Sequence, residues 1–325
     1  MFDLVLKGIF SSLFLASILR ISTPIILPAL GGLITELSGS INIALEGTML
    51  TSAFTGVVVS AYTHNIWLGL LAGIVAGMLF SALLAYFHLY LETNIILAGT
   101  ALNIMATGGT IFLLYILTGD KGNSSSLASG MVPVVEIPFL KDIPFLGVVF
   151  SGHNIFVYIG VILTFLTYIM LYNTKFGRHL RAVGENPIAA KSLGIPVRKI
   201  KFISIVISGF LASLGGMNLS MAYLSIFQRE MTAGRGFIAL AAVYLGGKKP
   251  WGTYLAALLF GAADALSNQL GTLDIPSQWV QVIPYAITII ALVAYGLRRK
   301  AQIIEQTRRF QERELEKVNG KTQES

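Results

Sequence analysis

Residues 173–201 read NTKFGRHLRAVGENPIAAKSLGIPVRKIK, a polar stretch between long apolar segments. It holds seven Lys or Arg side chains against a single acid, Glu185. Asn186 is a residue type that caps helices, and Pro187 suits the first helical position, where a missing N–H costs nothing. Residues 188–193 then allow about two turns before Gly194 ends them. The stretch therefore predicts one short helix that is flanked by basic residues and lies outside the membrane, in a protein that is otherwise mostly apolar.

The composition of the 325-residue chain is typical of a polytopic membrane protein. It is 54% hydrophobic and only 12% charged, whereas soluble domains are roughly 25% charged. The net charge of +7 does not indicate a nucleic-acid partner, because basic residues collect on one side of a membrane. The absence of cysteine excludes a disulfide framework and a thiol nucleophile.

The apolar segments predict an all-α protein with about 8–10 transmembrane helices. The candidate spans are 22–38, 45–62, 66–90, 97–118, 154–172, 202–224, 235–247, 252–270 and 279–297. Several are shorter than the ~20 residues that a straight spanning helix needs, which indicates broken helices inside a bundle. Residues 2–20 contain Asp3, Lys7 and Arg20, and we expect a helix at the membrane interface there.

The two halves of the bundle predict an inverted repeat. Blocks 22–118 and 202–297 each contain four candidate spans of similar total length. Nine crossings make the first block start on one side of the membrane and the second block on the other. This is a common plan among transporters.

The distribution of Lys and Arg predicts the orientation in the membrane. Most of the 23 Lys and Arg residues lie in three segments: seven in loop 173–201, two at Lys248–Lys249 and eight in the tail from Arg298. The nine crossings place all three segments on the same side of the membrane. The positive-inside rule makes that side cytoplasmic. The C-terminus is then cytoplasmic and the N-terminus extracellular, in a cytoplasmic membrane.

The chain is expected to have one large domain and one tail. Residues 1–298 form the transmembrane domain, with a cytoplasmic loop at 173–201 and an extracellular loop at 119–153. The extracellular loop is polar and contains proline, so we expect an irregular cap with one short helix. Residues 299–325 form a charged cytoplasmic tail.

The sequence lacks the motifs of an enzyme. There is no phosphate-binding GxxxxGK[ST] loop and no HExxH zinc motif, and the four histidines lie far apart. We therefore predict no catalytic residue, no metal site and no cofactor bound by this chain. If the protein carries out a process that consumes energy, that energy comes from a source other than this chain.

Polar side chains within the spans are the candidates for a translocation path or for bracing of the bundle, because charges at membrane depth are costly. Asn42 and Glu46 are four residues apart and would share a helix face, as would Asp264 and Asn268. Arg235 is expected to pair with Glu230 or with a carboxylate of the bundle. The predicted set is Asn42, Glu46, Asn103, Arg235, Asp264 and Asn268. The residues themselves leave open whether each contacts solute or supports a neighbouring helix.

Three segments together resemble a known family. They are SGSINIALEGTML at 38–50, FGRHLRAVGENP at 176–187 and GRGFIALAA at 234–242. The combination is similar to the permease subunits of bacterial ABC importers in the branched-chain amino acid and ribose permease superfamily. The first and third segments are most similar to its nucleoside-uptake branch, although Ala44 stands where that branch usually has Gly.

The resemblance implies partners and a mode of action. It implies a second permease subunit, identical or similar, an ABC ATPase subunit that binds ATP–Mg, and an extracellular substrate-binding lipoprotein. The basic flanks of loop 173–201 would meet an acidic rim of the ATPase or membrane lipids. The chain itself would not be an enzyme but would translocate nucleosides by alternating access.

The resemblance also implies that the short cytoplasmic helix is the coupling helix that docks on the ATPase. The residues implied are Gly184, Glu185, Asn186, Pro187, Ile188, Ala189, Ala190, Leu193 and Gly194. A permease for simple sugars is the alternative within the family. An ion-gradient-driven secondary transporter, with Glu46 or Asp264 as the ion site, is the alternative outside it.

Overall fold

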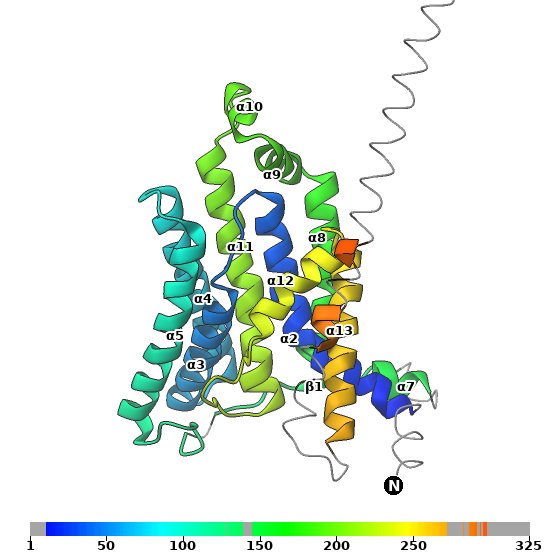
Figure 1. Ribbon diagram of the computed structural model, residues 1–325. Helices are drawn as coiled ribbons and strands as arrows, with labels where there is room; N and C mark the ends of the chain where they lie inside the picture. Colours follow the sequence, from blue (N-terminus) through cyan, green and yellow to red (C-terminus); the bar gives the residue numbers. More distant parts are fainter. Residues whose placement is uncertain are drawn as a thin grey trace, which may run out of the picture.

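The computed structural model describes residues 11–127, 129–138, 145–271, 282, 286–290, 293 and 295–297. Helices dominate this part of the chain (Figure 1). The long helices are α2 Ser12–Leu37, α3 Leu45–Thr63, α4 Ile66–Leu89, α5 Ile95–Thr118, α8 Ile155–Asn173, α11 Val197–Met217 and α13 Pro250–Leu270. The shorter ones are α7 Leu146–Phe150, α9 Lys175–Glu185, α10 Pro187–Ser192, the π-helix η1 Asn218–Tyr223 and α12 Arg235–Leu245.

Five of the nine membrane spans predicted from the sequence are confirmed in the described residues. Five helices are long and apolar enough to cross a bilayer: α2, α4, α5, α8 and the continuous α11–η1. Of the last expected span, the described residues 286–290 and 295–297 are helical. The exposed faces of α4, α5 and α8 are apolar, as lipid contact requires. The chain is thus a multi-pass membrane protein.

The helix at the membrane interface expected for residues 2–20 is not found where the structure describes the chain. Residues 12–20 belong to α2, which continues without a break to Leu37. The side-chain oxygen of Ser11 caps its first turn by accepting a hydrogen bond from the Phe14 N–H. Arg20 does not end the helix because its side chain is exposed, so it need not be buried with the apolar face.

Two spans are broken, as the sequence predicts. Residues 38–44 leave the end of α2 and return into the bundle as an extended segment before α3 begins (Figure 1). Residues 224–234 do the same between η1 and α12. Such irregular backbone is tolerated at membrane depth only when protein surrounds it.

The packing of the two halves is reciprocal. The first helix of one half, α2, packs on α12 and α13 of the other, and α11 packs on α3 and α4. The α2 and α11 helices also pack on each other and run in opposite directions (Figure 1). This arrangement agrees with the expected inverted repeat.

Small residues allow these helices to approach closely. A Cβ on Gly216 of α11 would collide with the Met49 carbonyl of α3. The Ser52 hydroxyl of α3 donates to the Ser213 carbonyl of α11 at 3.3 Å. Close backbone approach with hydroxyl hydrogen bonds is the usual way that helices associate in lipid.

The segment 119–153 closes the end of the bundle opposite to α9 and α10 (Figure 1). Its described residues include the short helix α7. It also contains a two-residue antiparallel pairing of β1 Val134–Val135 with β2 His153–Asn154, which the sequence did not predict. The backbone of Arg229 donates to the carbonyl of Gly122 at 2.8 Å, which ties the segment to the loop before α12. The charged tail 299–325 lies outside the described residues.

Candidate functional site

The short helix predicted from Asn186 to Gly194 is present as α10, at the tip of one end of the molecule (Figure 1). The Asn186 side-chain oxygen accepts from the N–H groups of Ile188 and Ala189, at 3.1 and 3.0 Å. Pro187 occupies the first turn, where its missing N–H is harmless. Gly194 follows with φ +78°, the left-handed conformation that glycine adopts at helix ends. The start and stop signals in the sequence are thus the ones that shape α10.

The residues of this end divide into buried and exposed ones. Ala190 is 2% exposed and seats α10 on the protein. A Cβ on Gly184 would collide with the Leu37 carbonyl, so Gly184 joins α9 to the end of α2. In contrast, Ile188 and Leu193 are 79% and 80% exposed. Glu185, Asn186, Pro187 and Ala189 are also exposed.

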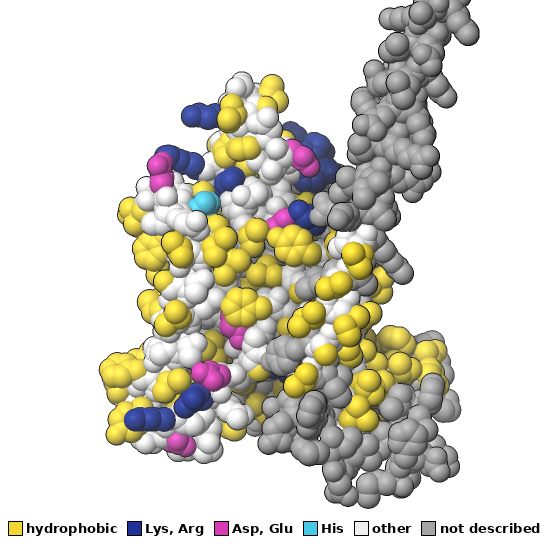
Figure 2. Space-filling model, in the orientation of Figure 1, with side chains coloured by type: hydrophobic (Ala, Val, Ile, Leu, Met, Phe, Trp, Pro, Cys, Tyr) yellow, Lys and Arg dark blue, Asp and Glu magenta, His cyan; other side chains and the backbone are white. Residues whose placement is uncertain are grey.

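The stretch before α10 is a second helix that sequence reasoning missed. α9 begins after Thr174, whose hydroxyl accepts from the Gly177 N–H at 3.1 Å. Leu180 and Val183 are buried and Phe176 is half-buried, whereas Lys175 and Arg178 are exposed. Apolar residues at positions i, i+4 and i+7 are the signal that could have identified it. Figure 2 shows Lys and Arg gathered at this end, above a broad apolar band.

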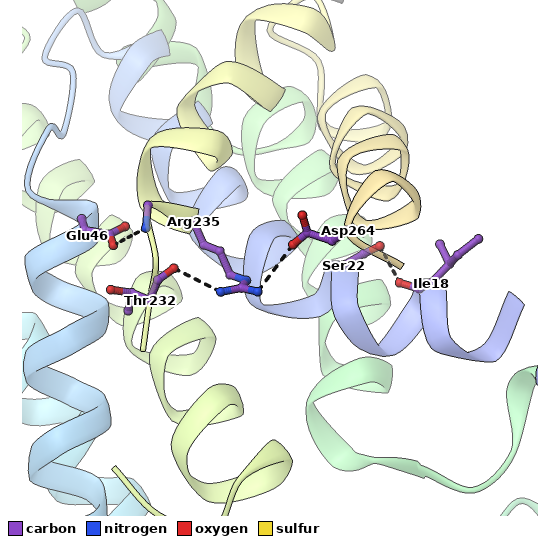
Figure 3. A network of polar contacts seen from close by, with 7 residues as sticks. Ile18, Ser22, Glu46, Thr232, Arg235 and Asp264 are labelled. Atoms are coloured by element: carbon purple, nitrogen blue, oxygen red, sulfur yellow. Dashed lines mark hydrogen bonds and ion pairs between the residues drawn. The ribbon is translucent and has the colours of Figure 1, made fainter. Parts of the chain in front are cut away.

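Glu46 links the two broken spans in the middle of the bundle (Figure 3). It lies in the first turn of α3, and its carboxylate oxygens accept from the N–H groups of Gly234 and Gly236, both at 2.7 Å. These N–H groups belong to the start of α12, where no intrahelical partner exists. Glu46 therefore caps a helix of the other half, and its negative charge meets the positive end of that helix dipole.

Arg235 pairs with a carboxylate of the bundle, which is one of the two alternatives that the sequence left open. Its Nη2 lies 3.5 Å from Oδ2 of Asp264 on α13, and its Nη1 donates to the Thr232 carbonyl at 3.4 Å (Figure 3). Both side chains are mostly buried. Asn268, one turn further along α13, is exposed and does not join this network.

Asn42 and Asn103 also support the broken segment 38–44. Nδ2 of Asn42 donates to the Ser208 hydroxyl of α11 at 3.0 Å. Asn103 of α5 accepts from the Gly47 N–H and donates to the Ile43 carbonyl, at 2.8 and 2.9 Å. The expectation that Asn42 and Glu46 share a helix face is wrong. Asn42 lies before the first residue of α3 and points to α11, because the chain is extended there.

A further charged cluster lies near the α9 end and was not predicted as a unit. Nζ of Lys248 is 2.6 Å from a carboxylate oxygen of Glu36, and the Tyr244 hydroxyl donates to the other oxygen at 2.9 Å. Glu36 lies in the last turn of α2, whereas Lys248 lies between α12 and α13. Glu36 and Lys248 are some two hundred positions apart, so the sequence gave no indication that they would pair.

The hydrogen bonds of the mid-bundle network join different helices to one another. The N-terminus of α12 is satisfied by Glu46, and the first turn of α3 is satisfied in part by Asn103. Among the described residues, no group of three or more His, Cys, Asp or Glu side chains could hold a metal ion. The N-terminus of α12 is thus already occupied by the Glu46 carboxylate.

Known proteins with similar sequences are transport permeases. The chain is 36% identical to the guanosine ABC transporter permease protein NupQ of Bacillus subtilis, over 87% of this chain and 92% of NupQ. It is 35% identical to the nucleoside ABC transporter permease protein NupC of Lactococcus lactis, over 86% and 91%.

A solved structure has a similar fold. A chain from an inward-facing ABC transporter described as of the metal-chelate type superposes with a TM-score of 0.53 at 16% identity, over 86% of this chain and 85% of that one. This likeness bears on the fold alone.

The family model for the permease component of branched-chain amino acid transport systems matches residues 14–292. This match covers almost all of the membrane domain, including both broken spans and the α9–α10 end. The protein therefore belongs to the family of permease components of branched-chain amino acid transport systems.

Proposed function

We propose that this chain is the membrane-spanning subunit of an ATP-driven nucleoside importer. The relatives NupQ and NupC are named for guanosine and nucleoside transport. The site supports an uncharged solute on physical grounds. A carboxylate solute would be stabilised by a free helix N-terminus at membrane depth, but Glu46 already occupies that of α12.

The coupling of transport to ATP rests on α10. Two large apolar side chains, Ile188 and Leu193, are almost fully exposed on a short capped helix. Neither is on a lipid-facing span, so a protein partner is the surface that would cover them. We assign this partner as an ABC ATPase subunit that binds ATP–Mg, with α10 as the coupling helix. The α9–α10 end is then cytoplasmic, which agrees with its Lys and Arg residues.

We infer the remaining partners from the similarity to ABC transporter permeases. A second permease subunit, identical or similar, completes the path, and a substrate-binding lipoprotein docks outside on the end that contains segment 119–153. The C-terminus is cytoplasmic and the N-terminus extracellular. ATP-driven closure of the ATPase pair moves α10, and the bundle alternates between the two sides.

The experiment that tests this assignment replaces Asn186–Leu193 with a Gly/Ser linker of equal length. The loss of ATPase assembly and of uptake, with normal amounts of permease in the membrane, supports it. Survival of both refutes it.

A milder change separates docking from folding. We expect the double variant Ile188→Ser, Leu193→Ser to keep the melting temperature of the purified permease, because both side chains are exposed. Uptake should fall at least about tenfold, because burying two such side chains against a partner supplies roughly 3–6 kcal/mol. The control is Ser192→Ala on the same helix, which should change neither quantity.

The solute is tested by competitive uptake in a deletion strain. Labelled guanosine uptake should be suppressed by excess unlabelled nucleosides and not by leucine or ribose. Uptake of a labelled simple sugar without uptake of labelled guanosine would favour the sugar permease. Uptake into proteoliposomes that contain the permease without an ATPase would favour the ion-gradient transporter.

A further inference from the structure

A groove lies beside α9, between the last turns of α8 and the start of α13. Its volume is about 360 Å³, and its lining residues are Tyr168, Tyr172, Lys249, Pro250, Trp251 and Gly252. The groove is outside α10 and outside the mid-bundle network, so neither proposed role explains it. Tyr168, Tyr172 and Trp251 are all substantially exposed, at 40%, 36% and 43%.

The level of the groove is that of a membrane surface. Tyr172 is next to the last residue of α8, and Pro250 is the first residue of α13. Tyrosine and tryptophan gather at this level because an apolar ring with a polar edge suits the headgroup region. Below the groove, the same two helices expose an apolar face that acyl chains can cover. It consists of Ile162, Phe165, Leu255 and Leu259.

Two basic side chains give the groove a positive charge. Lys249 lines it and is exposed. The guanidinium carbon of Arg181 lies 5.0 Å from the centre of the Tyr172 ring, a cation–π contact that holds it at the edge. The Nε of Arg181 is buried and has no hydrogen-bond partner in the described part of the chain.

Neither charge is neutralised by a carboxylate within the described residues. The nearby acid Glu36 is already paired with Lys248. A cation beside exposed aromatic rings matches the phosphate of a lipid headgroup. An acidic protein surface is less suitable. The acyl chains that cover the apolar face below the groove carry a headgroup, and a protein in the groove would leave that headgroup no place.

We propose that this groove binds the headgroup of an anionic phospholipid, with Lys249 and Arg181 contacting the phosphate and Trp251 lying against the lipid. The inference concerns a surface separate from α10 and from the solute path. It stands if the solute proves to be a sugar.

The tryptophans allow a direct test. The chain has three, Trp67, Trp251 and Trp279. We would replace Trp67 and Trp279 with Phe, reconstitute the full chain in vesicles, and measure quenching of Trp251 fluorescence by brominated phosphatidylglycerol and brominated phosphatidylcholine. Trp251 should select the anionic lipid by about fivefold or more, since each basic group near the surface contributes that factor.

Charge variants assign the preference to the groove. Lys249→Gln should lower it about fivefold and Lys249→Arg should keep it. Lys191→Gln, on α10 and outside the groove, is the matched control and should leave it unchanged. A second control keeps Trp67 as the single tryptophan. It lies at the opposite end of the bundle between uncharged neighbours, and should show no preference.

Three results would overturn the proposal. Equal quenching of Trp251 by both lipids would mean an ordinary lipid-facing surface. No quenching by either would mean that protein covers the groove. A preference that survives Lys249→Gln combined with Arg181→Gln would come from charges elsewhere.

Discussion

Replacing Glu46 with alanine should destabilise the bundle and abolish uptake. The change leaves the N–H groups of Gly234 and Gly236 without an acceptor inside a membrane domain. A hydrogen bond to a charged group contributes about 1.5–3 kcal/mol, so the expected loss is roughly 3–6 kcal/mol. The melting temperature of the permease in detergent should fall by on the order of 10 °C.

The series at this position distinguishes bracing from solute contact. Glu46→Gln keeps one acceptor oxygen, so its melting temperature should lie between those of the wild type and Glu46→Ala. If Glu46 instead bound solute, Glu46→Ala would lose uptake at an unchanged melting temperature. Glu92→Ala is the control, because its side chain is 78% exposed and surface ion pairs contribute little.

Replacing Gly216 with alanine should be as damaging as a large core truncation. The new Cβ would collide with the Met49 carbonyl and with the Ser52 hydroxyl of α3. Because the carbonyl is backbone, the helices themselves must separate, and overpacking of this kind costs about 1–3 kcal/mol or more. We expect a lower melting temperature and less folded permease in the membrane.

The matched control is the same substitution at Gly108 in α5. A Cβ there meets nothing within 4 Å, and alanine is a better helix former than glycine by up to about 1 kcal/mol. Gly108→Ala should therefore be neutral or slightly stabilising. Equal melting temperatures for the two variants would contradict the close α3–α11 packing.

The sequence predicted the parts of this protein that depend on local signals. Span limits followed from apolar runs, and the expected span 45–62 became α3 Leu45–Thr63. The helix α10 was predicted to within a residue, because Asn186, Pro187 and Gly194 act on the backbone next to them. The broken spans were predicted because Gly and polar residues interrupt apolar segments.

Pairings across the chain could not be predicted in the same way. Asp264 was one of several carboxylates that Arg235 could have reached, and only the packing of α12 on α13 selects it. The spacing of four residues placed Asn42 on the same helix as Glu46. Spacing alone does not reveal that this helix begins only after Asn42. The roles proposed for Ile188 and Leu193, and for any solute contact, remain predictions that the experiments above decide.

The link between Glu46 and α12 also constrains how the protein is made. The carboxylate and the two N–H groups that it binds are 188 and 190 positions apart in the chain. At about 5–20 residues per second, a ribosome delivers Gly234 roughly 10–40 s after Glu46. During that interval the carboxylate of Glu46 lacks the two N–H donors that it binds in the folded protein. The contacts of α3 that the structure shows are therefore complete only after α12 has been made.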